Sequence, residues 1–246
     1  MTAIDDLQDE LATYRLLAID MVLAAVNRLT DAQLRDPQAA YRALQEAFLE
    51  IVISFGEQAA QSAVDYLAFD RANARQLDTP PLIPDGLMLP DQIEGALQWA
   101  LRPLAEGDLE RVESQLSGAT QRLVWQAGRD TIADNIARAG TRFARVPQAD
   151  ACAFCLMLGS RGAVYITEQT ARFTTGRSTA SSGRPAGERY HDNCRCLPRE
   201  IRDDNEDELP DITTRLETVW GDSRASNLTQ FAAYLRENPF AEGVRY

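Results

Sequence analysis

The sequence predicts a mainly α-helical protein: an extended helical body of long helices, then a small α+β tip that contains cysteine and histidine, then an acidic C-terminal tail. Three observations support this fold class. Apolar residues recur at helical spacing over long stretches between Asp5 and Ala144. Turn-forming, β-branched and aromatic residues become frequent after Pro147. The single histidine and all four cysteines lie between residues 152 and 196.

Residues 1–145 are predicted to form the helical body. Within it, the stretch DTPPLIPDGLMLP (residues 78–90) contains four prolines and a glycine, which exclude a helix interior and indicate an extended connector. Pro147 is expected to end the last helix. The periodicity predicts helices over about residues 5–28, 37–75, 91–102 and 108–144.

The remainder is predicted to form a small Cys/His domain over residues 146–200 and an acidic linker with a short C-terminal helix over residues 201–246. Residues 174–189 are rich in Gly, Ser and Thr, which is typical of a solvated loop. The acidic run at residues 199–211 is typical of a solvated linker rather than a site. The closing helix is expected at about residues 227–237.

Length and hydropathy predict a globular protein without a membrane-spanning segment. A chain of 246 residues can bury a sizeable core in one large domain or two modest ones. No apolar run reaches the roughly 18 residues that a membrane span needs, so no membrane partner is expected. The acidic start lacks the basic region of a signal peptide, and we expect the protein to fold in a cytoplasm.

Charge is distributed unevenly along the chain. The formal net charge of −12 argues against a surface that binds nucleic acid or anionic lipid throughout. Between Arg138 and Arg199, however, the sequence contains ten arginines and four acidic residues. The formal net charge of this segment is therefore +6, and that of the rest of the chain is −18. All 25 basic residues are arginine, a planar donor suited to carboxylates and phosphates. An ordinary solvated surface is the alternative explanation. The candidate contact residues are Arg161, Arg172, Arg177, Arg184, Arg189 and Arg195.

The cysteine and histidine pattern is typical of a structural zinc site. Cys152-x2-Cys155 is followed after 35 residues by His191-x2-Cys194-x-Cys196. Two closely spaced pairs can complete a tetrahedral shell, and Cys152, Cys155, His191 and Cys194 form the favoured ligand set. Cys196 is an alternative fourth ligand, or it contacts one of the ligands without binding the metal itself. Three other states stay open: disulfides, plain buried thiols, and a redox or nucleophilic cysteine.

No enzymatic activity is expected. The sequence contains no serine hydrolase elbow, phosphate loop or two-carboxylate dyad. A cysteine–histidine hydrolase would need an orienting group and an oxyanion hole, and the sequence assigns neither. Such a hydrolase and a zinc-dependent nucleic-acid-binding module are the two alternative hypotheses for function.

Two segments, RFARVPQADACAFCLMLGSRGAVY (residues 142–165) and YHDNCRC (residues 190–196), resemble the phage Mu F-like minor head proteins. The branch they resemble is common in actinobacterial phages and prophages, where a helical body precedes C-x-x-C and H-x-x-C-x-C segments. The resemblance covers roughly residues 14–198. Two helical stretches also resemble the family: WQAGRDTI (residues 125–132) and DYLAFDRANAR (residues 65–75), the latter at Phe69, Asp70 and Arg71.

This resemblance implies a structural protein of the virion head interior, assembled in the host cytoplasm and associated with the portal vertex. Its expected roles are head morphogenesis, DNA packaging or ejection. The implied partners are the portal protein, other head proteins and packaged DNA, within a homo- or hetero-oligomeric assembly. Some relatives carry a fused maturation protease or a C-terminal toxin, and this sequence resembles the stand-alone structural form.

Overall fold

The structure is a computed structural model of the chain, and it describes residues 3–74, 79–148, 151–160, 196–202 and 211–238. The predicted fold class is confirmed, because the described residues are mainly helical with one two-stranded sheet. They form two compact units. The first unit contains residues 9–131, and the second contains residues 2–8 and 132–246. The change between units thus falls earlier than the predicted boundary after residue 145.

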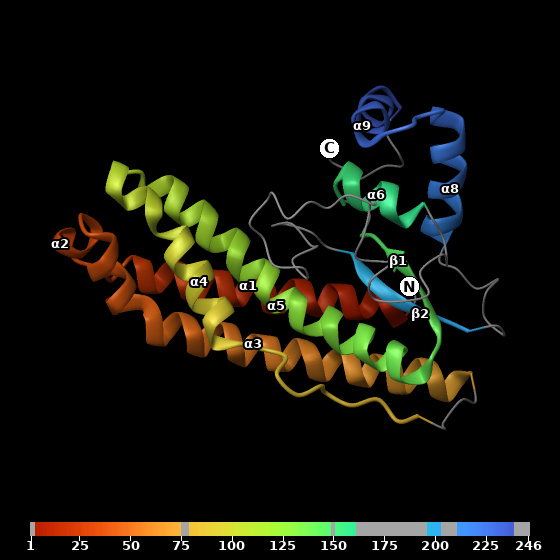
Figure 1. Cartoon of the computed structure of the whole chain (residues 1–246), viewed down its shortest axis with the longest axis horizontal. Coiled ribbons are helices and arrows are strands. Elements are labelled where there is room, and N and C mark those ends of the chain that lie inside the picture. The colour runs from red at the N-terminus through yellow and green to blue at the C-terminus, as the bar shows by residue number, and fades with distance from the viewer. Residues whose placement is uncertain (1–2, 75–78, 149–150, 161–195, 203–210, 239–246) are drawn as a thin grey trace. The chain divides into compact units, whose positions relative to one another are not determined.

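The first unit is built of long helices (Figure 1). Two of them cross the boundary between units: the first turns of α1 and the last turns of α5 belong to the second unit. Among the described helices, none is both long enough and apolar enough to cross a membrane. The elements are α1 (Ala3–Val26), α2 (Asp31–Leu34), α3 (Pro37–Asn73), α4 (Pro90–Ala100), the 3-10 helix η1 (Arg102–Glu106) and α5 (Leu109–Ala139).

N-terminal capping residues define where α2 and α3 begin. Thr30 and Gln33 form a capping box before α2, in which each side chain accepts a hydrogen bond from the other residue's backbone N–H, at 3.3 and 2.8 Å. The Asp36 carboxylate accepts a hydrogen bond from the backbone N–H of Gln38 at 2.9 Å, and Pro37 occupies the first position of α3. Local hydrogen bonds therefore define the boundary between α2 and α3, and α2 has no buried residue.

Close helix packing in the first unit depends on a glycine of α5. A Cβ atom added at Gly128 would lie 3.0 Å from Leu11 Cδ2 of α1 and 3.2 Å from the backbone oxygen of Ala59 of α3. The helix α5 therefore approaches both α1 and α3 through this one turn, and the three helices run side by side (Figure 1). Any larger side chain at position 128 would push against backbone.

Polar contacts fix how α1 lies against its neighbours in the first unit. Arg15 Nη1 donates a hydrogen bond to Gln121 Oε1 of α5 at 2.8 Å. The Tyr14 hydroxyl donates to Glu10 Oε1 at 2.7 Å and lies 3.2 Å from Ser62 Oγ of α3. Burial raises the pKa of Tyr14 above its ordinary value, so this hydroxyl stays protonated and remains a donor.

The proline-rich connector is extended, as predicted, and runs back along α3. Near its start, Arg71 Nη1 of α3 donates a hydrogen bond to the backbone oxygen of Thr79 at 2.6 Å. Near its end, the Met88 side chain packs against Gly56 of α3. The nine steps from residue 79 to residue 88 therefore cover fifteen residues of helix, or about 22 Å, which only an extended chain can do.

The long helix predicted to reach residue 144 ends earlier, at Ala139. Gly140 adopts a left-handed φ of 69°, its N–H donates to the Ala137 oxygen, and the next N–H, of Thr141, donates to the Ile136 oxygen. This arrangement is a Schellman motif, a common helix end that glycine permits at low cost. Gly140, and not Pro147, therefore ends α5.

The second unit combines a two-stranded antiparallel sheet with short helices (Figure 1). Residues 142–146 form strand β1, which pairs with residues 197–201. The prediction of a helix over residues 142–144 is therefore wrong. The helix α8 was not predicted, because the expected C-terminal region contained only one short helix, which the structure confirms as α9. The elements are β1 (Arg142–Val146), α6 (Ala153–Gly159), β2 (Leu197–Ile201), α8 (Asp211–Ser223) and α9 (Leu228–Glu237).

We expect Gly128→Val to lower the free energy of unfolding of the first unit by about 2 kcal/mol, because the new side chain meets the Ala59 backbone. Gly95→Ala in α4 is the matched control. No other group lies within 4 Å of its added Cβ, so alanine should raise the free energy of unfolding by about 0.5–1 kcal/mol. Urea unfolding followed by circular dichroism measures both. Equal effects of the two variants would contradict this packing.

Candidate functional site

Three of the five predicted metal ligands lie in the described part of the second unit. Cys152 is the N-cap of α6 and is half-buried. Cys155 lies within α6, Cys196 lies directly before β2, and both are fully buried. His191 and Cys194 lie outside the described residues, as do the six candidate contact arginines between residues 161 and 195.

These cysteines share one apolar core, which we call the cysteine core. Residues from α6, α8 and α9 close around it, and the rings of Trp220 and Phe231 meet edge to face with centroids 4.9 Å apart. Gly159 lets α6 approach closely, because a Cβ there would lie 2.8 Å from Pro147 Cδ. The buried members of the cysteine core are Ala151, Cys155, Leu156, Cys196, Leu216, Phe231 and Leu235.

The sheet brings Cys196 to this core. In the antiparallel register Val146 pairs with Leu197, so the residue before Leu197 lies beside the start of the segment that leads to α6. Gln8 Nε2 supports the same strand end by donating to the Val146 oxygen at 3.0 Å. The two cysteine segments, far apart in the sequence, are therefore adjacent in the fold.

Cys196 has a cationic neighbour. Arg145 Nη1 of β1 donates a hydrogen bond to Cys196 Sγ at 3.8 Å, and both residues are buried, at 1% and 0% exposure. The guanidinium carries a permanent charge, so a cationic donor lies against this sulfur inside the second unit. The contact therefore links Cys196 to β1 through a side chain, in addition to the strand pairing that follows it.

The described residues alone do not form a metal site. Among them, no three His, Cys, Asp or Glu side chains lie together in a way that could hold a metal ion. Cys152, Cys155 and Cys196 supply thiol donors of the kind zinc prefers, and they share the cysteine core without converging on one point. A zinc site here therefore needs His191 or Cys194, outside the described residues.

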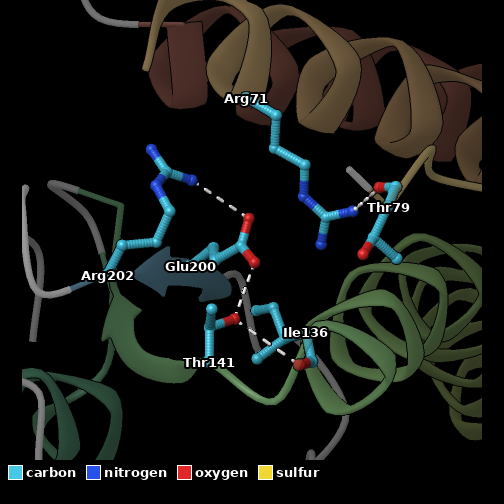
Figure 2. A network of polar contacts seen from close by, with 6 residues as sticks. All are labelled: Arg71, Thr79, Ile136, Thr141, Glu200 and Arg202. Atoms are coloured by element: carbon cyan, nitrogen blue, oxygen red, sulfur yellow. Dashed lines mark hydrogen bonds and ion pairs between the residues drawn. The ribbon is translucent and has the colours of Figure 1, made fainter. Parts of the chain in front are cut away.

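Glu200 is the centre of a buried polar network that the sequence did not predict (Figure 2). It is fully buried in β2, where its carboxylate accepts a hydrogen bond from Thr141 Oγ1 at 2.6 Å and pairs with Arg202 Nη1 at 3.1 Å. The Arg202 side chain is also buried, at 4% exposure. A buried pair of this kind stabilises one arrangement of the strands, since neither charge tolerates loss of its partner.

The prediction that residues 199–211 form a solvated linker is therefore wrong at its start. Residues 199–201 belong to β2, and Glu200 and Arg202 are buried. The composition of the run gave no sign of this, because Glu and Arg next to many acids are typical of a solvated segment. Pairing with β1, fifty residues earlier, removes these side chains from water.

Comparison with known proteins assigns the family. The VG15 protein family matches residues 1–222, most of the chain. The chain belongs to the VG15 protein family. This is a family of viral gene products, which agrees with the phage part of the resemblance and does not itself identify the Mu F-like branch. No curated protein and no solved structure significantly matches the chain.

We expect Glu200→Gln to lower the free energy of unfolding of the second unit by about 3 kcal/mol, because the variant loses the buried ion pair with Arg202. Glu217→Gln, at an exposed position of α8, is the matched control and should change it by less than about 0.5 kcal/mol. Urea unfolding combined with hydrogen exchange of peptides from β1 and β2 measures the difference. A cost as small as that of the control would show that the network is not formed.

Proposed function

We propose that the chain is a structural minor head protein of a tailed bacteriophage or prophage, located in the head interior and associated with the portal. It acts in head morphogenesis, DNA packaging or ejection through binding surfaces, without catalytic activity. Its partners are the portal protein and other head proteins, with packaged DNA as a further contact for the arginine-rich segment. The protein assembles in the host cytoplasm and remains in the virion.

One observation carries this proposal: the described parts of the two segments on which the Mu F-like resemblance rests, residues 142–148 and 151–160 and Cys196, lie in one compact unit. Residues 142–146 pair with residues 197–201, and Cys152, Cys155 and Cys196 share one core. A chance similarity of two short motifs would not require them to meet in space. Membership of a viral family over residues 1–222 supports the phage origin.

The two units suit a structural role in different ways. In the first unit the helices pack through a glycine contact at Gly128 and polar pairs such as Arg15–Gln121, which makes a rigid bundle. In the second, α6 and β2 flank residues 161–195, which contain six arginines in the sequence. A packed helical bundle and a second unit whose sequence includes a basic segment are suited to binding within an assembly.

To test the proposal, we would co-express the chain with the portal protein of the same phage genome and purify the portal by an affinity tag. We expect the chain to co-purify with this portal and not with the portal of an unrelated phage, which is the control. Mass spectrometry of purified virions should detect the chain. Its absence from both procapsids and virions would contradict a head role.

We also propose that the cysteine core is completed by one structural zinc ion, bound through Cys152, Cys155 and ligands among His191, Cys194 and Cys196. The support is the shared core of the three described cysteines. Bound zinc would cross-link a unit whose own apolar core is small.

A cysteine-to-serine series tests the zinc site. With zinc, Cys152→Ser and Cys155→Ser should both remove the metal and cost a similar amount of stability, because each loses one ligand. Without zinc, the fully buried Cys155 should cost about 1–3 kcal/mol and the half-buried Cys152 much less. Elemental analysis of protein purified without chelator, together with urea unfolding, separates the two results.

We do not propose the two alternative functions, a nucleic-acid-binding module and a cysteine–histidine hydrolase. Both hypotheses depend on His191, Cys194 and the arginines of residues 161–195, all outside the described residues.

A further inference from the structure

The helix α6 carries its two cysteines at two positions whose side chains reach toward each other. Cys152 is the N-cap, with an extended ψ of 160°, and its backbone oxygen accepts a helical hydrogen bond from the N–H of Leu156 at 3.0 Å. Cys155 is the third residue of the helix. In a capping box, the N-cap side chain reaches the backbone of the third residue, and the side chain of the third residue reaches back. The backbone of α6 therefore brings the two cysteine side chains together within one helical turn.

The same two positions of α2 show that such side chains can meet. Thr30 is the N-cap of α2, and its hydroxyl donates a hydrogen bond to Oε1 of Gln33, the third helical residue, at 2.9 Å. Residues three apart in a helical turn have Cα atoms about 5 Å apart. A disulfide needs Cα atoms about 4.4–6.8 Å apart. A bond between Cys152 and Cys155 is therefore compatible with an intact α6.

The two thiols differ in their access to solvent. Cys155 has no exposed surface and belongs to the cysteine core, and Cys152 is half-buried and packs against the edge of that core. An oxidant in solution therefore reaches the Cys152 sulfur first. The buried Cys155 is then positioned to react with the oxidised sulfur, which is the arrangement of a reactive cysteine with a resolving cysteine beside it.

We propose that Cys152 and Cys155 form a redox pair, which a peroxide converts from two thiols into one disulfide. The Cys152 sulfur attacks one oxygen of hydrogen peroxide, the O–O bond breaks, and the products are a sulfenic acid on Cys152 and one water. The Cys155 sulfur then attacks the sulfenic sulfur, and the displaced hydroxide leaves with the Cys155 proton as a second water. The pair loses two electrons, and the peroxide gains them.

The consequence for zinc rests on the zinc site proposed above. A cysteine binds zinc as a thiolate, so a disulfide removes both Cys152 and Cys155 from the ligand set at once. A structural zinc site has four ligands, and the loss of two releases the metal. In the zinc-bound form both sulfurs start as thiolates, and the protons of the two waters come from solvent. We therefore expect one zinc ion to be released for each disulfide formed.

Peptide mapping of the full chain by mass spectrometry, before and after treatment with hydrogen peroxide, tests the pair. The wild-type chain should gain a disulfide between Cys152 and Cys155. Cys152→Ser should slow the oxidation of Cys155 at least about tenfold, because the remaining sulfur is buried. Cys196→Ser is the matched control: it removes another buried cysteine of the same core and leaves the pair in place, so the disulfide should still form.

Three results would overturn the redox pair. The first is a wild-type chain in which both cysteines stay reduced or reach sulfinic acid without pairing. The second is a disulfide that joins Cys152 or Cys155 to Cys194 or Cys196. The third is a Cys152→Ser variant in which Cys155 is oxidised as fast as in the wild type.

A chromogenic chelator added to the same samples measures zinc release and separates this inference from the zinc proposal. One zinc ion released per disulfide supports both. A disulfide formed in protein that held no zinc when purified contradicts the zinc site and leaves the redox pair standing. Zinc that stays bound after the disulfide has formed overturns the predicted release. The redox pair does not depend on the head role, and failure of portal binding would leave it standing.

Discussion

The structure depends most on the burial of α5, a helix that is covered on nearly every side over its second half. Its buried residues include several polar ones, among them Thr120, Gln121 and Arg129. Buried polar side chains cost free energy unless they find partners, so they restrict the helix to positions where partners exist. Arg15 meets Gln121, and the Arg129 guanidinium lies 5.3 Å from the centre of the Trp125 ring. These contacts, together with the close approach at Gly128, define how α1 and α3 lie against α5.

The end of α5 determines how the second unit begins. Because Gly140 closes the helix in a Schellman motif, the chain turns out of the helix and enters β1 two residues later. Thr141, in that turn, donates to the buried Glu200 of the returning strand. A single helix end thus supplies both the direction of β1 and a hydrogen-bond donor for its partner strand. The cysteine core and the Arg145–Cys196 contact follow from the same strand pairing.

The two units differ in how they use charge. The first keeps most of its charged side chains at the surface. The second buries Arg145, Glu200 and Arg202 inside a small fold. Buried charges restrict the fold to arrangements that pair them, at a cost in desolvation. The second unit therefore combines polar pairs, which restrict how its strands pair, with the apolar contacts of the cysteine core.

The sequence by itself determined the helical class, the positions of α1, α3, α4 and α9, and the extended connector, because each depends on local periodicity, capping or proline. It also located the cysteine segments. Only the tertiary structure decided that residues 142–146 are a strand, that α8 exists, and that Glu200 is buried. The reason is physical: a strand is stabilised by its partner, and the partner of β1 lies about fifty residues away, beyond the reach of any local pattern. The same strand pairing decides whether the Glu200 side chain is exposed to solvent or buried beside Arg202. The neighbouring residues in the sequence do not decide it.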